Sequence, residues 1–169
     1  GTIIAPKVVL TAAHCIEEGG TDLYFVPGQT TRIWGQVSKY KHSIKALRAH
    51  VFPKFSERNA HNTDIAVIVF EKEFAAKPLS LSIQYAVNER VTIAGYPDDK
   101  KRGTLWEDSG FLDGESYTID TYAGQSGSSL RNKNDEVIGV HSHAKRGPRK
   151  NFATLLSNEH IEFIEKYVD

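Results

Sequence analysis

The sequence has one cysteine, Cys15, no long hydrophobic run and no excess of charge of either sign. A single cysteine cannot form an internal disulfide, and one thiol does not distinguish a reducing from an oxidising compartment. No apolar run approaches the roughly 20 residues that a membrane-spanning helix needs, and no signal peptide with a basic start and an apolar middle is visible. We therefore expect no segment that spans a membrane.

Acidic and basic residues balance at 21 each in a chain of 169 residues, so no overall field attracts nucleic acid or another strongly charged partner. Any selectivity is expected to come from local charge. Apolar residues make up 40% of the chain and charged residues 25%, which is typical of a soluble globular protein. A chain of this size buries roughly 70% of its unfolded surface, enough for one ordinary domain or two closely packed halves.

Short apolar groups separated by turn signals run through most of the sequence. They lie at residues 1–6, 8–10, 23–26, 33–37, 45–51, 65–70, 90–97, 105–106, 116–120 and 136–140. Short strands at a spacing of roughly 8 to 12 residues, without long helical periodicity between them, predict an all-β barrel or sandwich. The continuous apolar run at 65–70 predicts a strand that is buried on both faces.

The two strings of strands predict two β lobes, one formed by residues 1–71 and one by residues 89–156. Residues 72–88 are expected to link them, because proline and the loss of alternation interrupt the pattern there. Residues 157–169 predict one helix, since Ser157 suits an N-cap and apolar residues then recur along one face.

The stretch from Thr121 to Ser129 places Ser126 between two glycines. Glycine lets a backbone take positive φ or approach a ligand closely, so the stretch predicts a tight turn that presents one hydroxyl. In a catalytic interpretation, Ser126 is a nucleophile and the amides of Gly124 and Ser126 face a developing oxyanion. The alternative is an ordinary Gly/Ser loop.

Two further residues have unusual surroundings for their type. His14 follows a run of small residues that tightens into a helical turn, which leaves room for a substrate beside its ring. Asp64 opens the buried strand at 65–70, and a buried carboxylate needs a dedicated partner. A cap or turn onto local amides is the alternative for Asp64.

Ser126, His14 and Asp64 are the three groups that nucleophilic acyl transfer needs, and their order along the chain is His, Asp, Ser. The α/β-hydrolases have a different order and a second glycine where Ser128 stands.

With the segments Thr11–Cys15, Asp64–Val67 and Gly124–Ser128 in this order, the chain resembles the trypsin-like (chymotrypsin-fold) serine proteases over nearly its whole length. This resemblance implies two six-stranded antiparallel β-barrels with a C-terminal helix, and the catalytic triad between them. The barrels of this family have a strand before the segment that starts here at Gly1, so the first barrel is expected to be incomplete at its N-terminus. No cofactor and no metal are implied.

Within that family the chain is most similar to the bacterial glutamyl endopeptidases, the V8-like group. Their threonine five residues before the serine and their histidine fifteen after it bind a substrate carboxylate, which points to Thr121 and His141. A hydroxyl and an imidazole can both donate to a carboxylate. The alternative is cleavage after Lys or Arg, because Asp120 stands where trypsin-like enzymes carry an acid.

Two other patterns in the second half have weaker functional interpretations. His141 and His143 could be two zinc ligands on one strand, but no third ligand follows at a readable spacing. The basic residues of the following loop either attract acidic peptides or form a solvated loop; they are Lys145, Arg146, Arg149 and Lys150.

The resemblance implies a secreted bacterial endopeptidase that acts on protein or peptide substrates with an acidic residue at the cleaved position. The chain departs from relatives at Ser129, often proline, and at His143 and Ala144, often glycine. Relatives with a cysteine at the Cys15 position usually pair it with one just upstream of Gly1. The rival hypotheses are a non-catalytic member of the fold that binds protein, and a serine esterase.

Overall fold

The computed structural model describes residues 1–18, 22–29, 42–56, 62–145 and 150–168. The predicted strand at 33–37 lies outside these ranges, as do Arg146 and Arg149. Among the described residues, no helix is both long and apolar enough to cross a bilayer.

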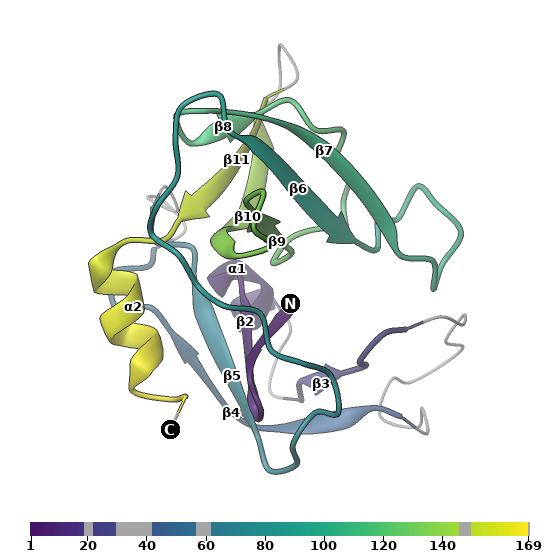
Figure 1. The fold of residues 1–169 in the computed structure, drawn as a ribbon. Helices are drawn as coiled ribbons and strands as arrows, with labels where there is room; N and C mark the ends of the chain where they lie inside the picture. The colour runs from purple at the N-terminus through teal and green to yellow at the C-terminus, as the bar shows by residue number, and fades with distance from the viewer. Residues whose placement is uncertain (19–21, 30–41, 57–61, 146–149, 169) are drawn as a thin grey trace.

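The first lobe is a curled five-stranded sheet with the strand order β1-β2-β5-β4-β3 (Figure 1). Its strands are β1 (Thr2–Ala5), β2 (Val8–Thr11), β3 (Tyr24–Phe25), β4 (Ile44–Val51) and β5 (Ala66–Phe70). β5 pairs with β2 on one side and with β4 on the other. Its two faces pack in different apolar clusters, Val67 in one and Phe70 in the other, which explains its nearly continuous apolar sequence.

The second lobe is a closed six-stranded barrel with the strand order β10-β11-β8-β7-β6-β9. Its strands are β6 (Arg90–Gly95), β7 (Trp106–Asp113), β8 (Ser116–Tyr117), β9 (Ser129–Arg131), β10 (Val137–Lys145) and β11 (Lys150–Leu155). The barrel interior is packed with apolar side chains, including Ile93, Tyr117 and Leu130. The predicted all-β, chymotrypsin-like architecture is confirmed.

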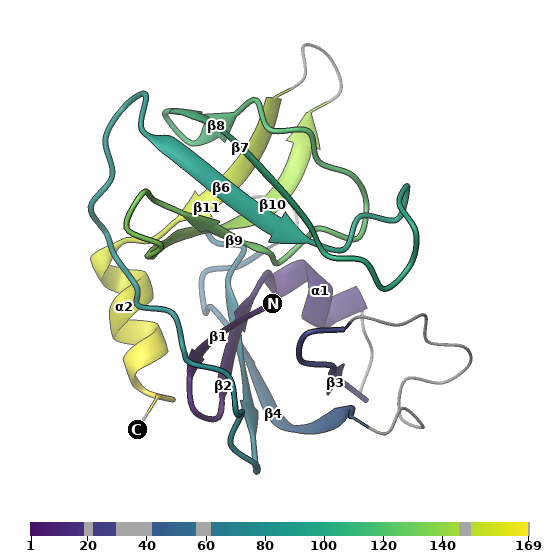
Figure 2. The same cartoon turned by 45° about the vertical axis from the view of Figure 1, so that its right-hand side comes forward.

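One apolar cluster joins the two lobes. It contains Val8 and Leu10 from β2, Val140 from β10 and Phe163 from the C-terminal helix α2 (Asn158–Glu165). Figures 1 and 2 show β2 and helix α1 (Ala13–Glu18) facing the second barrel, while α2 covers the side of the molecule where the lobes meet. The end of β2 therefore lies next to the loops of the second barrel.

Helix α2 is anchored by a histidine that the sequence did not single out. His160 is buried, its Nδ1 accepts a hydrogen bond from the Ser157 amide at 3.2 Å, and its Nε2 lies 3.0 Å from the Asn62 carbonyl. Nδ1 can accept this bond only while it carries no proton. Burial lowers the pKa of His160 below its usual value, which is consistent with a neutral ring.

We expect acid to weaken this anchor. Because the folded pKa of His160 is lowered, the unfolded chain binds a proton that the folded chain does not, and the free energy of unfolding falls as the pH drops below about 6.5. In His160→Gln the free energy of unfolding should depend less steeply on pH between 7 and 5, as measured by urea denaturation. An unchanged slope would contradict this role of His160.

Candidate active site

His14 and Asp64 meet because two paired strands end at the same edge of the first sheet. Thr11, the last residue of β2, is the register partner of Ala66, the first residue of β5. The chain continues from β2 into α1, which carries His14, and it enters β5 through Asp64. His14 Nδ1 lies 2.7 Å from Asp64 Oδ2, and the His14 amide donates to Asp64 Oδ1 at 3.0 Å.

Asp64 is 1% exposed and accepts a third hydrogen bond, from the Ser142 hydroxyl of β10, at 2.6 Å. Burial opposes ionisation of this carboxyl, but the hydrogen bonds from His14 and Ser142 outweigh burial and hold its pKa below the usual value. The carboxylate is therefore charged and fixed in position at neutral pH.

The same pair changes the acid–base behaviour of His14. The hydrogen bond with Asp64, helped by Cys15, raises the pKa of His14 above its usual value of 6.5. The Sγ atom of Cys15 lies 3.7 Å from His14 Nε2, within hydrogen-bond distance for sulfur, and Cys15 forms no disulfide. Since Asp64 holds Nδ1–H, Nε2 is the ring atom available to take a proton.

The loop that carries Ser126 packs against the start of α1. Gly127 has φ +79°, and a Cβ atom added to it would lie 3.1 Å from the Ala12 amide nitrogen and would overlap Thr11 Oγ1. Ser126 is half-buried and makes no hydrogen bond with His14 or any other described residue.

The amide groups on either side of this turn are unpaired. Gly124 has φ +93°, and a Cβ there would approach the Tyr96 carbonyl to 2.7 Å, so only glycine fits. Within the described ranges, neither the Gly124 nor the Ser126 amide donates a hydrogen bond to another backbone group. Two free N–H groups are thus available to a ligand oxygen at the turn.

His141 is 4% exposed and is joined to both the barrel and the serine loop. Its amide donates to the Ser128 carbonyl at 2.8 Å, and its carbonyl accepts from Gly127 at 2.9 Å. Burial, with a contribution from His143, lowers the pKa of His141 to about 4. The imidazole is neutral at pH 7.

Tyr117 determines which nitrogen of His141 carries the proton. Its hydroxyl contacts His141 Nδ1, and burial raises the pKa of Tyr117, so the phenol keeps its proton and donates. Nδ1 is then the acceptor, and the single ring proton is on Nε2. In the described structure Nε2 has no hydrogen-bond partner, which leaves this N–H free to donate.

Thr121 is half-buried, and its hydroxyl donates to Asn151 Oδ1 at 2.6 Å. Asn151 in turn donates to the Ile119 carbonyl, which fixes the amide orientation. Thr121 must therefore exchange this hydrogen bond before it can donate to a substrate carboxylate.

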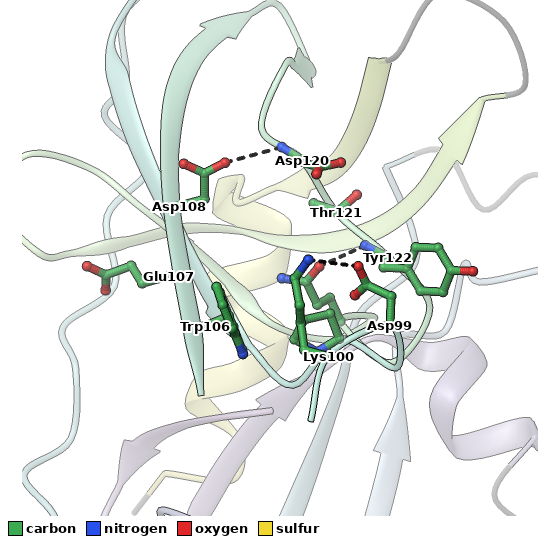
Figure 3. Close-up of a pocket in the computed structure, with 10 residues that line it drawn as sticks. Asp99, Lys100, Trp106, Glu107, Asp108, Asp120, Thr121 and Tyr122 are labelled. Atoms are coloured by element: carbon green, nitrogen blue, oxygen red, sulfur yellow. Dashed lines mark hydrogen bonds and ion pairs between the residues drawn. The ribbon is translucent and has the colours of Figure 1, made fainter. Parts of the chain in front are cut away.

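Asp120 is the residue that suggested cleavage after Lys or Arg, and its side chain lies away from His141. Its exposed side chain lines a cavity together with Asp108, and Figure 3 shows the Asp120 amide directed at the Asp108 carboxylate. His141 does not line this cavity.

The two histidines of β10 have separate partners. His143 is exposed and stacks on Phe152 at 5.3 Å between ring centroids, whereas His141 contacts Tyr117. Within the residues that the structure covers, no three His, Cys, Asp or Glu side chains are placed to hold a metal ion. Of the basic loop residues, Lys150 forms an ion pair with Asp113 at 3.0 Å.

Sequence reasoning missed Ser142, Tyr117 and Asn151, which hold Asp64, His141 and Thr121 respectively. One signal was present for Ser142: it follows His141 in a strand whose preceding residues are mostly apolar, and consecutive polar residues in a buried strand need partners.

Comparison with known proteins finds similarity to proteases. A family model described as Trypsin matches residues 1–159. A glutamyl endopeptidase of Staphylococcus aureus (strain MW2) is 39% identical over 155 residues, covering 83% of this chain and 45% of the relative. A glutamyl endopeptidase of Staphylococcus aureus (strain MRSA252) is 27% identical over 155 residues, covering 83% of this chain and 41% of the relative. The chain thus spans less than half the length of these curated relatives.

A solved structure of a Glu endopeptidase in complex with MPD superposes with a TM-score of 0.83 at 26% identity, covering 98% of this chain and 83% of that one. Since the family model matches nearly the whole sequence and the solved protease has the same fold, the chain belongs to the trypsin family.

Proposed function

We propose that this chain is the catalytic part of a secreted bacterial serine endopeptidase that cleaves after Glu or Asp. The observation that carries the proposal is the 2.7 Å contact between His14 and Asp64, with the Ser126 loop packed beside it. The paired ends of β2 and β5 hold His14 and Asp64, and the Ser126 loop lies against Thr11 and Ala12. The relatives named glutamyl endopeptidase support the same substrate class.

In this mechanism, Ser126 Oγ attacks the carbonyl carbon of the scissile bond while His14 Nε2 takes the hydroxyl proton. The carbonyl oxygen becomes an oxyanion, for which the free amides of Gly124 and Ser126 are the donors. His14 then protonates the leaving amine, and water repeats the sequence on the acyl-enzyme. Asp64 keeps Nδ1 protonated and stabilises the imidazolium.

Recognition of the acidic side chain is assigned to His141 and Thr121. The free Nε2–H of neutral His141 donates to the substrate carboxylate, and Thr121 donates after leaving Asn151. Hydrogen bonds to a charged acceptor in a site shielded from water are stronger than those between neutral groups.

Peptides that differ only at the scissile position test this specificity. We expect kcat/KM for Glu to exceed that for the isosteric Gln by about 10- to 100-fold, the value of one or two charge-assisted hydrogen bonds. Initial rates with Glu, Gln and Lys peptides give the measurement. Equal rates, or a preference for Lys, would contradict the assignment of Thr121 and His141.

Tyr117→Phe tests the tautomer argument. Without the phenol, His141 Nδ1 has no donor, so the ring proton is no longer held on Nε2 and the Glu-to-Gln ratio of kcat/KM should fall about tenfold. Tyr85→Phe removes a hydroxyl from an exposed tyrosine and is the matched control. A ratio that stays at the wild-type value in Tyr117→Phe would remove Tyr117 from this role.

Reactions at Ser126 distinguish the proposed endopeptidase from its two rivals, a non-catalytic binding module and an esterase. A serine-directed organophosphonate that labels the protein, but not Ser126→Ala, excludes a non-catalytic binding module. An esterase would turn over ester but not amide substrates, whereas the proposed endopeptidase hydrolyses both.

A further inference from the structure

The segment that leads into β5 turns sharply at Asp64. The Thr63 carbonyl accepts a hydrogen bond from the Ile65 amide at 2.8 Å, so the chain makes a three-residue turn centred on Asp64. Just before this turn, Asn62 has φ +60°, in the left-handed region that asparagine adopts more readily than most residues. The direction of the Asp64 carboxylate therefore depends on how residues 62–65 are held.

The first sheet fixes only one end of this segment. The Ile65 carbonyl accepts a hydrogen bond from the Phe52 amide at 2.9 Å, and the next residue, Ala66, begins β5. Asn62 and Thr63 precede the strand and lie outside its ladder. The end of the segment before Asp64 therefore needs a different anchor.

Side-chain packing provides little support for that end. Asn62 is exposed, and both Asn62 and Thr63 line a cavity of about 250 Å³, which His160 also borders. A side chain that faces a cavity has no partner atoms on that side and gains no contact energy there. Hydrogen bonds are left to fix the position of Asn62.

Two hydrogen bonds connect Asn62 to other parts of the molecule. His160 Nε2 of α2 donates to the Asn62 carbonyl at 3.0 Å, and Asn62 Nδ2 donates to Glu115 Oε1 of the second lobe at 2.6 Å. His160 is 3% exposed, whereas the bond to Glu115 is open to solvent. A hydrogen bond shielded from water is electrostatically stronger than one in water, so His160 is the main anchor of Asn62.

The His160 ring is itself held in place. The Ser157 amide donates to its Nδ1, and the Phe52 ring packs edge-on against it at 4.7 Å between centroids. Because Nδ1 is an acceptor, the single proton of the neutral ring is on Nε2 and is directed at the Asn62 carbonyl. Helix α2, which covers the side where the lobes meet, thus presents a fixed donor to the segment that carries Asp64 (Figure 1).

We propose that His160 is a positioning residue for catalysis: through its hydrogen bond to the Asn62 carbonyl, it fixes the turn that presents Asp64 to His14. His160 touches none of the reacting groups, in contrast to Ser142, which binds the Asp64 carboxylate directly. This inference rests on the proposed function, because the effect of His160 is exerted on the proton transfer by His14.

A pair of substitutions of nearly equal size isolates the hydrogen bonds of His160. His160 is the third residue of α2, where a glutamine can accept the Ser157 amide and also donate to the Asn62 carbonyl. Methionine can do neither. In His160→Met the plateau of kcat at high pH on a Glu peptide should fall about tenfold, because a small displacement of a catalytic group is costly. KM should not change, and His160→Gln should keep kcat within about twofold of the wild type.

A measurement without substrate separates this inference from the proposed function. The His14 Nδ1–H proton lies in a 2.7 Å contact with the Asp64 carboxylate, so its NMR resonance is expected at low field and should be lost in Asp64→Asn. In His160→Met this resonance should move to higher field, and the pKa of His14 should fall toward 6.5. His160→Gln should keep both. If the wild type cleaves no Glu peptide, the proposed function fails, but these signals still decide the role of His160.

Glu159→Gln is the matched control on the same helix. It removes an exposed ion pair between Glu159 and Lys54, at 2.6 Å, which is another contact of α2 with the first lobe. The hydrogen bond from His160 to Asn62 is left intact. We expect wild-type kcat and wild-type His14 signals in this variant.

Urea denaturation shows whether each variant is folded under the assay conditions. If His160→Met is not, Asn62→Gly takes its place: glycine accepts the positive φ, but it loses the bond to Glu115 and loosens the backbone. The His14 resonance and pKa should then shift in the same direction as expected for His160→Met. Wild-type kcat and His14 signals in the folded variant overturn the proposal. Equal losses in His160→Met and His160→Gln, or in His160→Met and Glu159→Gln, also overturn it.

Discussion

Replacing Ser126 with alanine is expected to lower kcat on a Glu peptide by about a millionfold. Removing the nucleophile of a Ser-His-Asp protease costs about as much as removing the whole triad, because the three groups act as a unit. The residual rate comes from the oxyanion donors and from substrate binding. Release of a chromophoric leaving group over hours measures the loss.

Ser128→Ala is the matched control for this change. Ser128 lies in the same loop and is buried, and its amide hydrogen bond to Gln125 does not involve the side chain. We expect kcat within about tenfold of the wild type. If Ser126→Ala keeps wild-type kcat, or if both variants lose activity equally, Ser126 is not the nucleophile.

The parts of the site that the sequence predicts well are those set by local order along the chain. His14 follows β2 and Asp64 precedes β5, so recognising two apolar strands was enough to place both residues at strand ends. The tight turn at Ser126 could be predicted because its glycines allow the positive φ found at Gly124 and Gly127.

The parts that could not be predicted depend on pairing between distant segments. Ser142 reaches Asp64 only because β10 of the second barrel lies beside the end of the first sheet, across 78 residues of sequence. Tyr117 meets His141 across the barrel, and no local pattern encodes that contact. The direction of the Thr121 hydroxyl likewise follows from where β11 places Asn151.

Some strands were missed for a different reason. The apolar group at 105–106 predicted only the start of β7, because Glu107 and Asp108 then add exposed polar residues and the alternation is lost. β9 has only three residues, Ser129–Arg131. Turn-forming residues directly precede β11, so the sequence does not indicate where this strand begins. Closure of the barrel supplies the hydrogen-bond partners that make these weak sequences into strands, and closure is a property of the whole lobe.

The second large effect is expected for Asp64→Asn, which should lower kcat by about 10⁴-fold. The amide cannot hold Nδ1–H of His14 as the carboxylate does, so the ring takes the tautomer whose Nε2 carries the proton and cannot accept one from Ser126. Substrate binding should be little changed, because Asp64 is buried behind His14. Urea denaturation shows whether Asp64→Asn is folded under the assay conditions, which distinguishes a loss of chemistry from a loss of folding.

The pH dependence of activity distinguishes a role of Asp64 in the chemistry from a purely structural role. His14 must be neutral to act as a base, and Asp64 raises its pKa, so wild-type activity should rise with pH at values above 6.5. In Asp64→Asn the pKa falls, and the residual activity should rise at lower pH. If the wild type and Asp64→Asn had nearly the same pH profile of activity, Asp64 would not influence the proton transfer by His14.

The His14–Asp64 pair also affects stability, and its contribution is lost both at high pH and at low pH. The raised pKa of His14 stabilises the folded chain below pH 6.5, and this contribution is lost as the pH rises through the folded pKa. The lowered pKa of Asp64 stabilises it above pH 3.8, and this contribution is lost as the pH falls through the folded pKa. The free energy of unfolding lost in Asp64→Asn should therefore be largest between these two values, where the wild-type pair is fully charged. Urea denaturation of both proteins at pH 3, 5 and 9 tests this, and an equal loss at all three would show that no ion pair contributes.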